Sequence, residues 1–177
     1  NSNLLDRIDL SNINLAGTDL SNVSLKGKNL SGTILTGADL TGEILTGADL
    51  TGTILTRADL SDAILRGANL SGNDLTGTIL TGADLTGTIL TGADLSDAIL
   101  TGADLSDSNF QYAIFDNANL ENVNLYNAEF IQVDLTKIKN KSLAGADLSE
   151  ASFAHSNLSG VNLAGVILHR TNFGNAD

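Results

Sequence analysis

The sequence predicts an all-β solenoid, a chain that bends at short regular intervals and stacks coil upon coil. Leucine or phenylalanine recurs at every fifth position from Leu5 to Leu135, mostly with a small residue two positions before it and often with glycine two positions after it. The chain has 177 residues, enough for one domain with a sizeable core. Aromatic residues make up only 4% of the chain, so the regular packing of aliphatic side chains is expected to form that core.

A period of five residues fits neither an α-helix nor a flat strand. Five residues advance an α-helix by about 500°, which would spread the leucines around its whole surface. A flat strand alternates its faces every residue, so an odd period would place successive leucines on opposite faces. A chain that turns a corner after each leucine brings all of the leucines to the inside.

Each of the five positions in a repeat unit then has a defined role, as residues 38–42 illustrate. Ala38 and Leu40 point inward, Asp39 points outward, and Thr41 and Gly42 form the corner. Glycine at the second corner position allows the positive φ of a type II turn. Asparagine tolerates this conformation best after glycine, and it replaces glycine at Asn12, Asn22, Asn117, Asn122 and Asn127. Successive coils are expected to stack at about 4.8 Å.

Tandem units such as ADLTG at 38–42, ADLSD at 103–107 and ANLEN at 118–122 resemble the repeats of the pentapeptide-repeat proteins. The resemblance covers almost the whole chain, and the regular TGADL and TGTIL runs are similar to those of cyanobacterial members. It implies a right-handed quadrilateral β-helix with four pentapeptides per coil, about nine coils in a rod about 40 Å long. The spacing alone leaves the number of sides open.

Within a single β-helix of residues 1–177, the period breaks at 136–142. Leu135 and Leu143 are eight residues apart. Either three extra residues bulge outward, or two are skipped while Ile138 fills the core. Three lysines are concentrated there on an otherwise acidic chain, at Lys137, Lys139 and Lys141. This segment is interpreted either as a loop that contacts a partner or as a solvated insertion.

Other departures concern charge and apolar surface. Lys28 and Glu43 occupy inward positions, where we expect them to form an ion pair or to reach separately toward solvent. Several isoleucines occupy the outward position. Coils of 20 residues would stack them in pairs, as possible self-association surfaces or as β-branched residues that favour a ladder: Ile34 with Ile54, Ile44 with Ile64, and Ile79 with Ile99.

The composition argues against most catalytic and cofactor-binding functions. Without cysteine there is no disulfide, thiolate nucleophile or cysteine-based zinc site. The two histidines, His155 and His169, occupy corner positions without an obvious partner, so we assign no catalytic, cofactor-binding or metal-binding residue. No run of about 18 apolar residues and no signal peptide is visible, which predicts a cytoplasmic protein that does not contact a membrane.

The net charge of −12 predicts that the chain does not bind nucleic acid directly. The favoured hypothesis is a non-enzymatic structural or protein-interaction scaffold that presents an acidic rod to an unidentified protein partner. The rod is expected to be a monomer or to self-associate weakly, end to end or face to face. An alternative follows from the resemblance, since quinolone-resistance members of the family act as DNA mimics that bind a type II topoisomerase and protect gyrase. A remote alternative is divalent-cation binding on an outward ladder of Asp19, Asp39 and Asp59.

Overall fold

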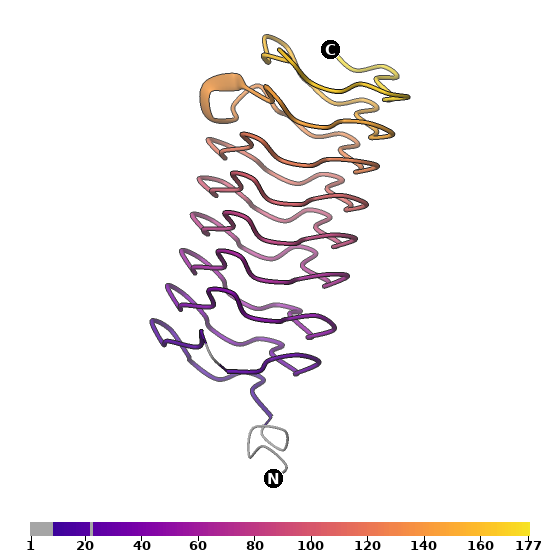
Figure 1. The fold of residues 1–177 in the computed structure, drawn as a ribbon. Coiled ribbons are helices and arrows are strands. Elements are labelled where there is room, and N and C mark those ends of the chain that lie inside the picture. The colour runs from indigo at the N-terminus through magenta and orange to yellow at the C-terminus, as the bar shows by residue number, and fades with distance from the viewer. Residues whose placement is uncertain (1–8, 22) are drawn as a thin grey trace.

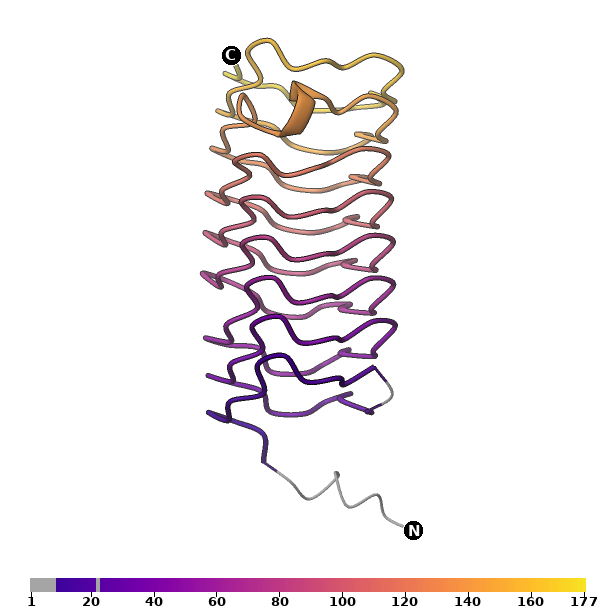
Figure 2. The ribbon, with the colours of Figure 1, turned by 90° about the vertical axis from the view of Figure 1, so that its left-hand side faces the viewer.

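The computed structural model describes residues 9–21 and 23–177, which form one elongated stack of coils (Figure 1, and turned by 90° in Figure 2). Parallel β-bridges join outward residues of neighbouring coils, and every bridge from Asn14–Ile34 to Asn109–Glu129 joins residues 20 apart. Twenty residues are four pentapeptides, so each of these coils consists of four repeats. Each pentapeptide therefore lies next to the pentapeptide four units earlier in the sequence, in the neighbouring coil.

The sides of each coil are very short. Most of the described sides contribute a single bridged residue, at the outward position between two inward side chains. The one helical element in the described part of the chain is the 3-10 helix η2 (Lys139–Lys141), which protrudes from the stack in Figure 1. At the end of each side, two corner residues turn the chain onto the next side.

The corners have the predicted turn geometry. The Ala38 N–H donates to the Leu35 carbonyl at 2.9 Å, and Gly37 between them has a φ of 64°. Asparagine adopts the same conformation, as at Asn117 with a φ of 58°, although the predicted Asn22 lies outside the described residues. Larger side chains also occupy this position, including Tyr112 with a φ of 61°. The fold therefore imposes a left-handed conformation on residues that rarely adopt it.

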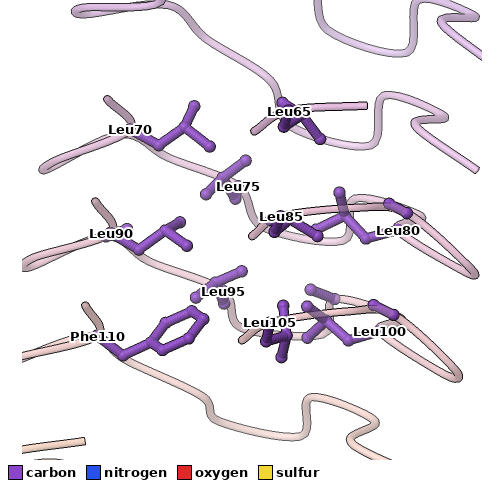
Figure 3. Close-up of a cluster of buried hydrophobic side chains, with 14 of the residues drawn as sticks. Leu65, Leu70, Leu75, Leu80, Leu85, Leu90, Leu95, Leu100, Leu105 and Phe110 are labelled. Carbon is purple, nitrogen blue, oxygen red and sulfur yellow. The ribbon is translucent and has the colours of Figure 1, made fainter. Parts of the chain in front are cut away.

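The inward leucines form one continuous core (Figure 3). The leucines from Leu65 to Leu105 and the following Phe110 are each at most 1% exposed. Burial of one such side chain contributes about 1.5–3 kcal/mol. The strict spacing of leucine is thus explained by packing between coils.

Phenylalanine replaces leucine in one column toward the C-terminal end. The ring centroids of Phe110 and Phe130 lie 4.8 Å apart, those of Phe130 and Phe153 lie 5.1 Å apart, and those of Phe153 and Phe173 lie 5.5 Å apart. The rings of these three pairs are nearly parallel, with interplanar angles of 27°, 18° and 14°. The aromatic residues therefore stack along the axis of the rod and extend the core.

Several inward positions hold polar residues whose side chains bond to the backbone. The Thr53 hydroxyl donates to the Leu30 carbonyl at 3.0 Å, and the Asn73 amide donates to the Leu50 carbonyl at 2.8 Å. Within the described residues, no buried side-chain nitrogen or oxygen lacks a hydrogen-bond partner. The second threonine of each TGTIL unit is thus buried in the core, where its hydroxyl bonds to the carbonyl group of a leucine position.

The break in the period is accommodated by a bulge together with a core residue. The bridges change from 20 residues apart to 23 at Asn124–Asp147, and return to 20 at Ser142–Asn162. The three extra residues form η2, while Ile138 occupies the inward position and is only 3% exposed. The structure therefore combines elements of the two alternatives, since three residues bulge and Ile138 still fills the core.

Candidate functional site

The outward positions form columns along the rod, several of which are acidic. Asp19, Asp39 and Asp59 are bridged one above another, as predicted, and Asp19 and Asp39 are exposed. The same column continues with Ile79 and Ile99. Three carboxylates at the spacing of neighbouring coils concentrate negative charge on one side of the rod.

Each carboxylate is held by the corner that follows it. Oδ1 of Asp39 accepts the Thr41 N–H at 3.0 Å, and Oδ1 of Asp59 accepts both the N–H and the hydroxyl of Ser61, at 3.0 and 2.6 Å. An aspartate that accepts the N–H two residues later is a known device for stabilising turns. This explains the D-L-[S/T] pattern, a role that the sequence analysis missed although the recurrent spacing of Asp and Ser or Thr indicates it.

Hydrogen bonds of this kind lower the pKa of two exposed aspartates, Asp19 and Asp49. The pKa of Asp19 is lowered by the hydroxyl and the N–H of Ser21, and the pKa of Asp49 is lowered in the same way by Thr51. Both groups therefore remain charged down to mildly acidic pH. The columns present fixed negative charges in a rigid geometry.

Neutral amides bridge some of the acidic residues between coils. The Asn117 amide donates to Asp97 at 2.6 Å, and the Asn127 amide donates to Asp107 at 2.8 Å, each across 20 residues. Such pairs stabilise the corner columns without neutralising the carboxylates. The 20-residue spacing of Asp and Asn signals them, once the size of the coil is known.

The three lysines of the period break have different environments. Nζ of Lys137 contacts Oδ2 of Asp116 at 3.1 Å, and this hydrogen bond and charge raise the pKa of Lys137. Lys139 and Lys141 belong to η2 and are exposed. Lys137 is thus paired with the rod, while Lys139 and Lys141 project from it.

The isoleucine pairs occur where they were predicted. Bridges join Ile34 to Ile54, Ile44 to Ile64, and Ile79 to Ile99. Ile44, Ile54 and Ile99 are about two-fifths exposed. Aspartate or asparagine follows each pair in its column, at Asp74, Asp84 and Asn119. The apolar stacks are short, and self-association through them stays a prediction.

Glu43 is a buried carboxylate with a structural role. It is 5% exposed, and Oε1 accepts the N–H of Ile44 at 3.0 Å and that of Leu25 at 3.4 Å. It thereby satisfies two backbone donors where the ladder between residues 24 and 44 has no bridge among the described residues. The ion pair with half-buried Lys28 stays a prediction, and a double-mutant cycle with no coupling between the two residues would contradict it.

The remaining titratable residues do not form a catalytic arrangement in the described part of the chain. His155 and His169 are both exposed at corners. Over residues 9–21 and 23–177, no group of three or more His, Asp or Glu side chains is placed to hold a metal ion. No helix in the same part of the chain combines the length and apolar character needed to cross a bilayer.

An open hollow of about 370 Å³ lies on one side of the rod near the period break. Aromatic, aliphatic, acidic, amide and basic side chains from two neighbouring coils line the hollow: Tyr112, Ile114, Asp116, Gln132, Asp134 and Lys137. Tyr112 is 54% exposed and Ile114 is 47% exposed. The sequence analysis did not predict this hollow, because it depends on how the two coils separate.

Comparison with known proteins identifies relatives of this fold. The profile of the family described as pentapeptide repeats matches residues 5–42, 44–82, 74–107, 103–139 and 142–177. No curated protein sequence matches the chain.

Three solved structures are similar. HetL, a pentapeptide-repeat protein involved in heterocyst differentiation regulation in the cyanobacterium Nostoc sp. strain PCC 7120, is 33% identical over 96% of this chain and 84% of its own, with a TM-score of 0.56. A pentapeptide-repeat protein of the Arabidopsis thaliana thylakoid lumen is 36% identical over 56% of this chain and 69% of its own, with a TM-score of 0.54. Rfr23 of the cyanobacterium Cyanothece 51142 is 27% identical over 63% of this chain and 87% of its own, with a TM-score of 0.54.

Proposed function

Because the chain belongs to the pentapeptide-repeat family, we propose that it is a non-enzymatic interaction scaffold whose acidic columns bind a basic segment of a protein partner. The observation that carries this proposal is the bridged column of Asp19, Asp39 and Asp59, in which the carboxylates are fixed by the corners that follow them. In this proposal the rod is a right-handed quadrilateral helix of about nine coils.

The rigidity of the columns supports binding through charge. A partner does not need to order these carboxylates, because hydrogen bonds to the following corner already hold them. Lys and Arg side chains of the partner are long and flexible, so they can follow carboxylates stacked at about 4.8 Å. A surface with a net charge of −12 also accelerates the approach of a basic partner and repels an acidic one.

The structural use of the polar residues supports a non-enzymatic role. The aspartates accept hydrogen bonds from corners, and the buried hydroxyl groups donate to carbonyl groups, as Thr33 does to Leu10 at 2.7 Å. HetL is described as involved in regulation, a role of the kind that a binding scaffold performs.

The proposal is tested by titrating the protein with a 12-residue peptide of alternating Lys and Ser in a calorimeter. We expect the triple variant Asp19→Asn, Asp39→Asn, Asp59→Asn to bind at least about fivefold more weakly than the unmodified protein. Asparagine retains the acceptor oxygen that bonds to the corner, so the turns should be preserved.

A matched variant distinguishes the column from the net charge. Asp62→Asn, Asp97→Asn, Asp107→Asn removes the same three charges from corner positions, where asparagine tolerates the positive φ. We expect this variant to bind the peptide nearly as well as the unmodified protein. Equal weakening in both triple variants would contradict the role of the column.

The alternative function, mimicry of DNA at a type II topoisomerase, predicts a different result. Twelve net charges over about 40 Å give about half of the charge density of B-DNA, which carries one charge per about 1.7 Å. Inhibition of gyrase supercoiling by the protein, without binding to the basic peptide, would replace the scaffold proposal with the mimic.

A further inference from the structure

The hollow beside Tyr112 coincides with a break in the β-ladder. Bridges join Asp94 to Ile114 and Asp134 to Asn157, but among the described residues none joins Ile114 to Asp134. One coil earlier, the Leu95 N–H donates to the Ile114 carbonyl at 2.8 Å, and the Ile114 N–H donates to the Ala93 carbonyl at 2.9 Å.

The equivalent backbone bonds are missing at the hollow. Within the described residues, the Phe115 N–H has no bond to the Asp134 carbonyl, and the Asp134 N–H has none to the Ala113 carbonyl. The corners on both sides remain joined, by Tyr112 N–H to the Ile131 carbonyl at 3.3 Å and by Asn117 N–H to the Lys137 carbonyl at 2.8 Å. The backbone bonds are therefore kept at the two corners that flank the hollow, although in the described part of the chain the next side, Asn119 against Ser142, also has no bridge.

Ser156 marks the inner side of this separation. Its hydroxyl donates to the Phe130 carbonyl and accepts the Val133 N–H at 3.1 Å. One coil earlier, the Ala113 N–H donates directly to the Phe110 carbonyl at 2.9 Å. The Ser156 hydroxyl thus lies between two backbone groups whose equivalents one coil earlier bond directly to each other.

The hollow offers hydrogen-bond acceptors and an aromatic ring. Within the described part of the chain, no ladder N–H donates to the carbonyls of Ala113 and Asp134. Oδ1 of Asp134 accepts the N–H and hydroxyl of Thr136, at 2.9 and 2.7 Å, and among the described residues none donates to Oδ2. Tyr112 supplies a half-exposed ring at the rim. Acceptors beside an aromatic face are suited to a planar cation with several donors.

We infer that this hollow receives the guanidinium group of an arginine presented by the basic partner, an inference that rests on the proposed function. Guanidinium has five N–H donors and stacks on aromatic rings, which an ammonium group does less well. An anion is disfavoured because Asp116 and Asp134 line the hollow on a rod of net charge −12.

The ammonium group of Lys137 competes with an incoming arginine for the carboxylate of Asp116. Its ammonium group contacts Asp116 at 3.1 Å at the edge of the same hollow. The carboxylate of Asp116 is therefore already paired with Lys137 when an arginine arrives. The carboxylate of Asp134 still has one oxygen, Oδ2, available to accept a hydrogen bond. Removing the lysine charge should strengthen arginine binding, whereas removing the Asp134 charge should weaken it.

The inference is tested with the full chain, labelled with ¹⁵N, and three 12-residue peptides that are otherwise lysine and serine. One carries a central arginine, one the neutral isostere citrulline, and one lysine. We expect saturable amide shifts at Phe115, Gln132 and Asp134 with the arginine peptide, and binding about fivefold tighter than with citrulline.

Three variants sharpen the test. Asp134→Asn should abolish the preference for arginine, and Lys137→Gln should increase the affinity for the arginine peptide about threefold. Asp94→Asn is the matched control, since Asp94 lies in the same column where the ladder is closed and also accepts the N–H two residues later, from Ser96 at 2.9 Å. It should retain the preference for arginine. A well-dispersed amide spectrum of each variant shows that it is folded.

The outcomes separate the two proposals. If all three peptides bind equally and shift only residues of the Asp19–Asp39–Asp59 column, the arginine site is wrong and the scaffold proposal stands. If none of the peptides binds, both are wrong. Shifts at the hollow that persist with citrulline would also overturn the role of the guanidinium charge.

Discussion

Substitution of Ser156 by alanine tests how the structure satisfies its buried backbone. Ser156 and Ser108 both occupy inward positions and are buried, 2% and 1% exposed. The Ser156 hydroxyl accepts the Val133 N–H at 3.1 Å, so its removal leaves a buried donor without its partner. The Ser108 hydroxyl donates to the Leu85 carbonyl, which also accepts the N–H and hydroxyl of Thr88, at 3.0 and 2.8 Å.

These contacts predict different costs for the two substitutions. An unsatisfied buried donor costs about 1–3 kcal/mol, and we expect about 2 kcal/mol for Ser156→Ala. The Leu85 carbonyl keeps two donors after Ser108→Ala, so about 0.5 kcal/mol is expected there. For a chain of this size, the first substitution should lower the melting temperature by about 4–8 °C and the second by about 1–2 °C.

Urea unfolding followed by far-UV circular dichroism measures both free energies. Ser156→Thr retains the hydroxyl, and threonine occupies the same inward position at Thr33, so this variant should recover most of the loss. Hydrogen exchange should also show that the Val133 amide loses protection in Ser156→Ala alone. Equal costs for the two alanine variants would refute the reasoning.

Three further predictions use the same urea assay. Gly47 has a φ of +69° and open space where a Cβ would lie, so Gly47→Ala should cost about 1 kcal/mol from backbone strain, and a neutral result would contradict the left-handed corner. Leu85 is fully buried and Leu168 is 46% exposed, so Leu85→Ala should cost about 3–5 kcal/mol and Leu168→Ala less than about 1 kcal/mol; similar costs would contradict the core. The lowered pKa of Asp49 stabilises the fold above its unfolded value of about 4, and this contribution disappears as pH falls through the folded value. Between pH 6 and pH 3, Asp49→Asn should therefore lose less stability than the unmodified protein. A larger loss would contradict the stabilising role of the hydrogen bonds from Thr51 to the Asp49 carboxylate.

The sequence predicted the features that repeat in every unit. The inward leucines, the outward aspartates and the glycine corners depend only on local periodicity, and they are found where expected, as at Leu40, Asp39 and Gly42. The stacking of Ile34 on Ile54 required the number of residues per coil, which came from the resemblance and not from the period. Once the number of residues per coil is known, the sequence pattern predicts which residues of neighbouring coils lie next to each other.

The candidate sites were less predictable because they depend on exceptions to the repeat. The sequence located the break near Lys137 but left open how Ile138 and the extra residues share the space. The hollow lies beside the contact between Val133 and Ser156, two residues that are 23 positions apart because of that insertion. Its position was not apparent from the order of residues alone. The left-handed conformation of Tyr112 is also imposed by the neighbouring coils, against its own preference.

The most direct test of the account is the salt dependence of binding to the basic peptide of alternating Lys and Ser. If fixed carboxylate columns carry the interaction, the association constant should fall at least about tenfold between about 50 mM and about 300 mM NaCl. The Asp19→Asn, Asp39→Asn, Asp59→Asn variant should show a much shallower fall. An association constant that is independent of salt, or an equally steep fall in that variant, would contradict the claim that this rod acts through its acidic columns.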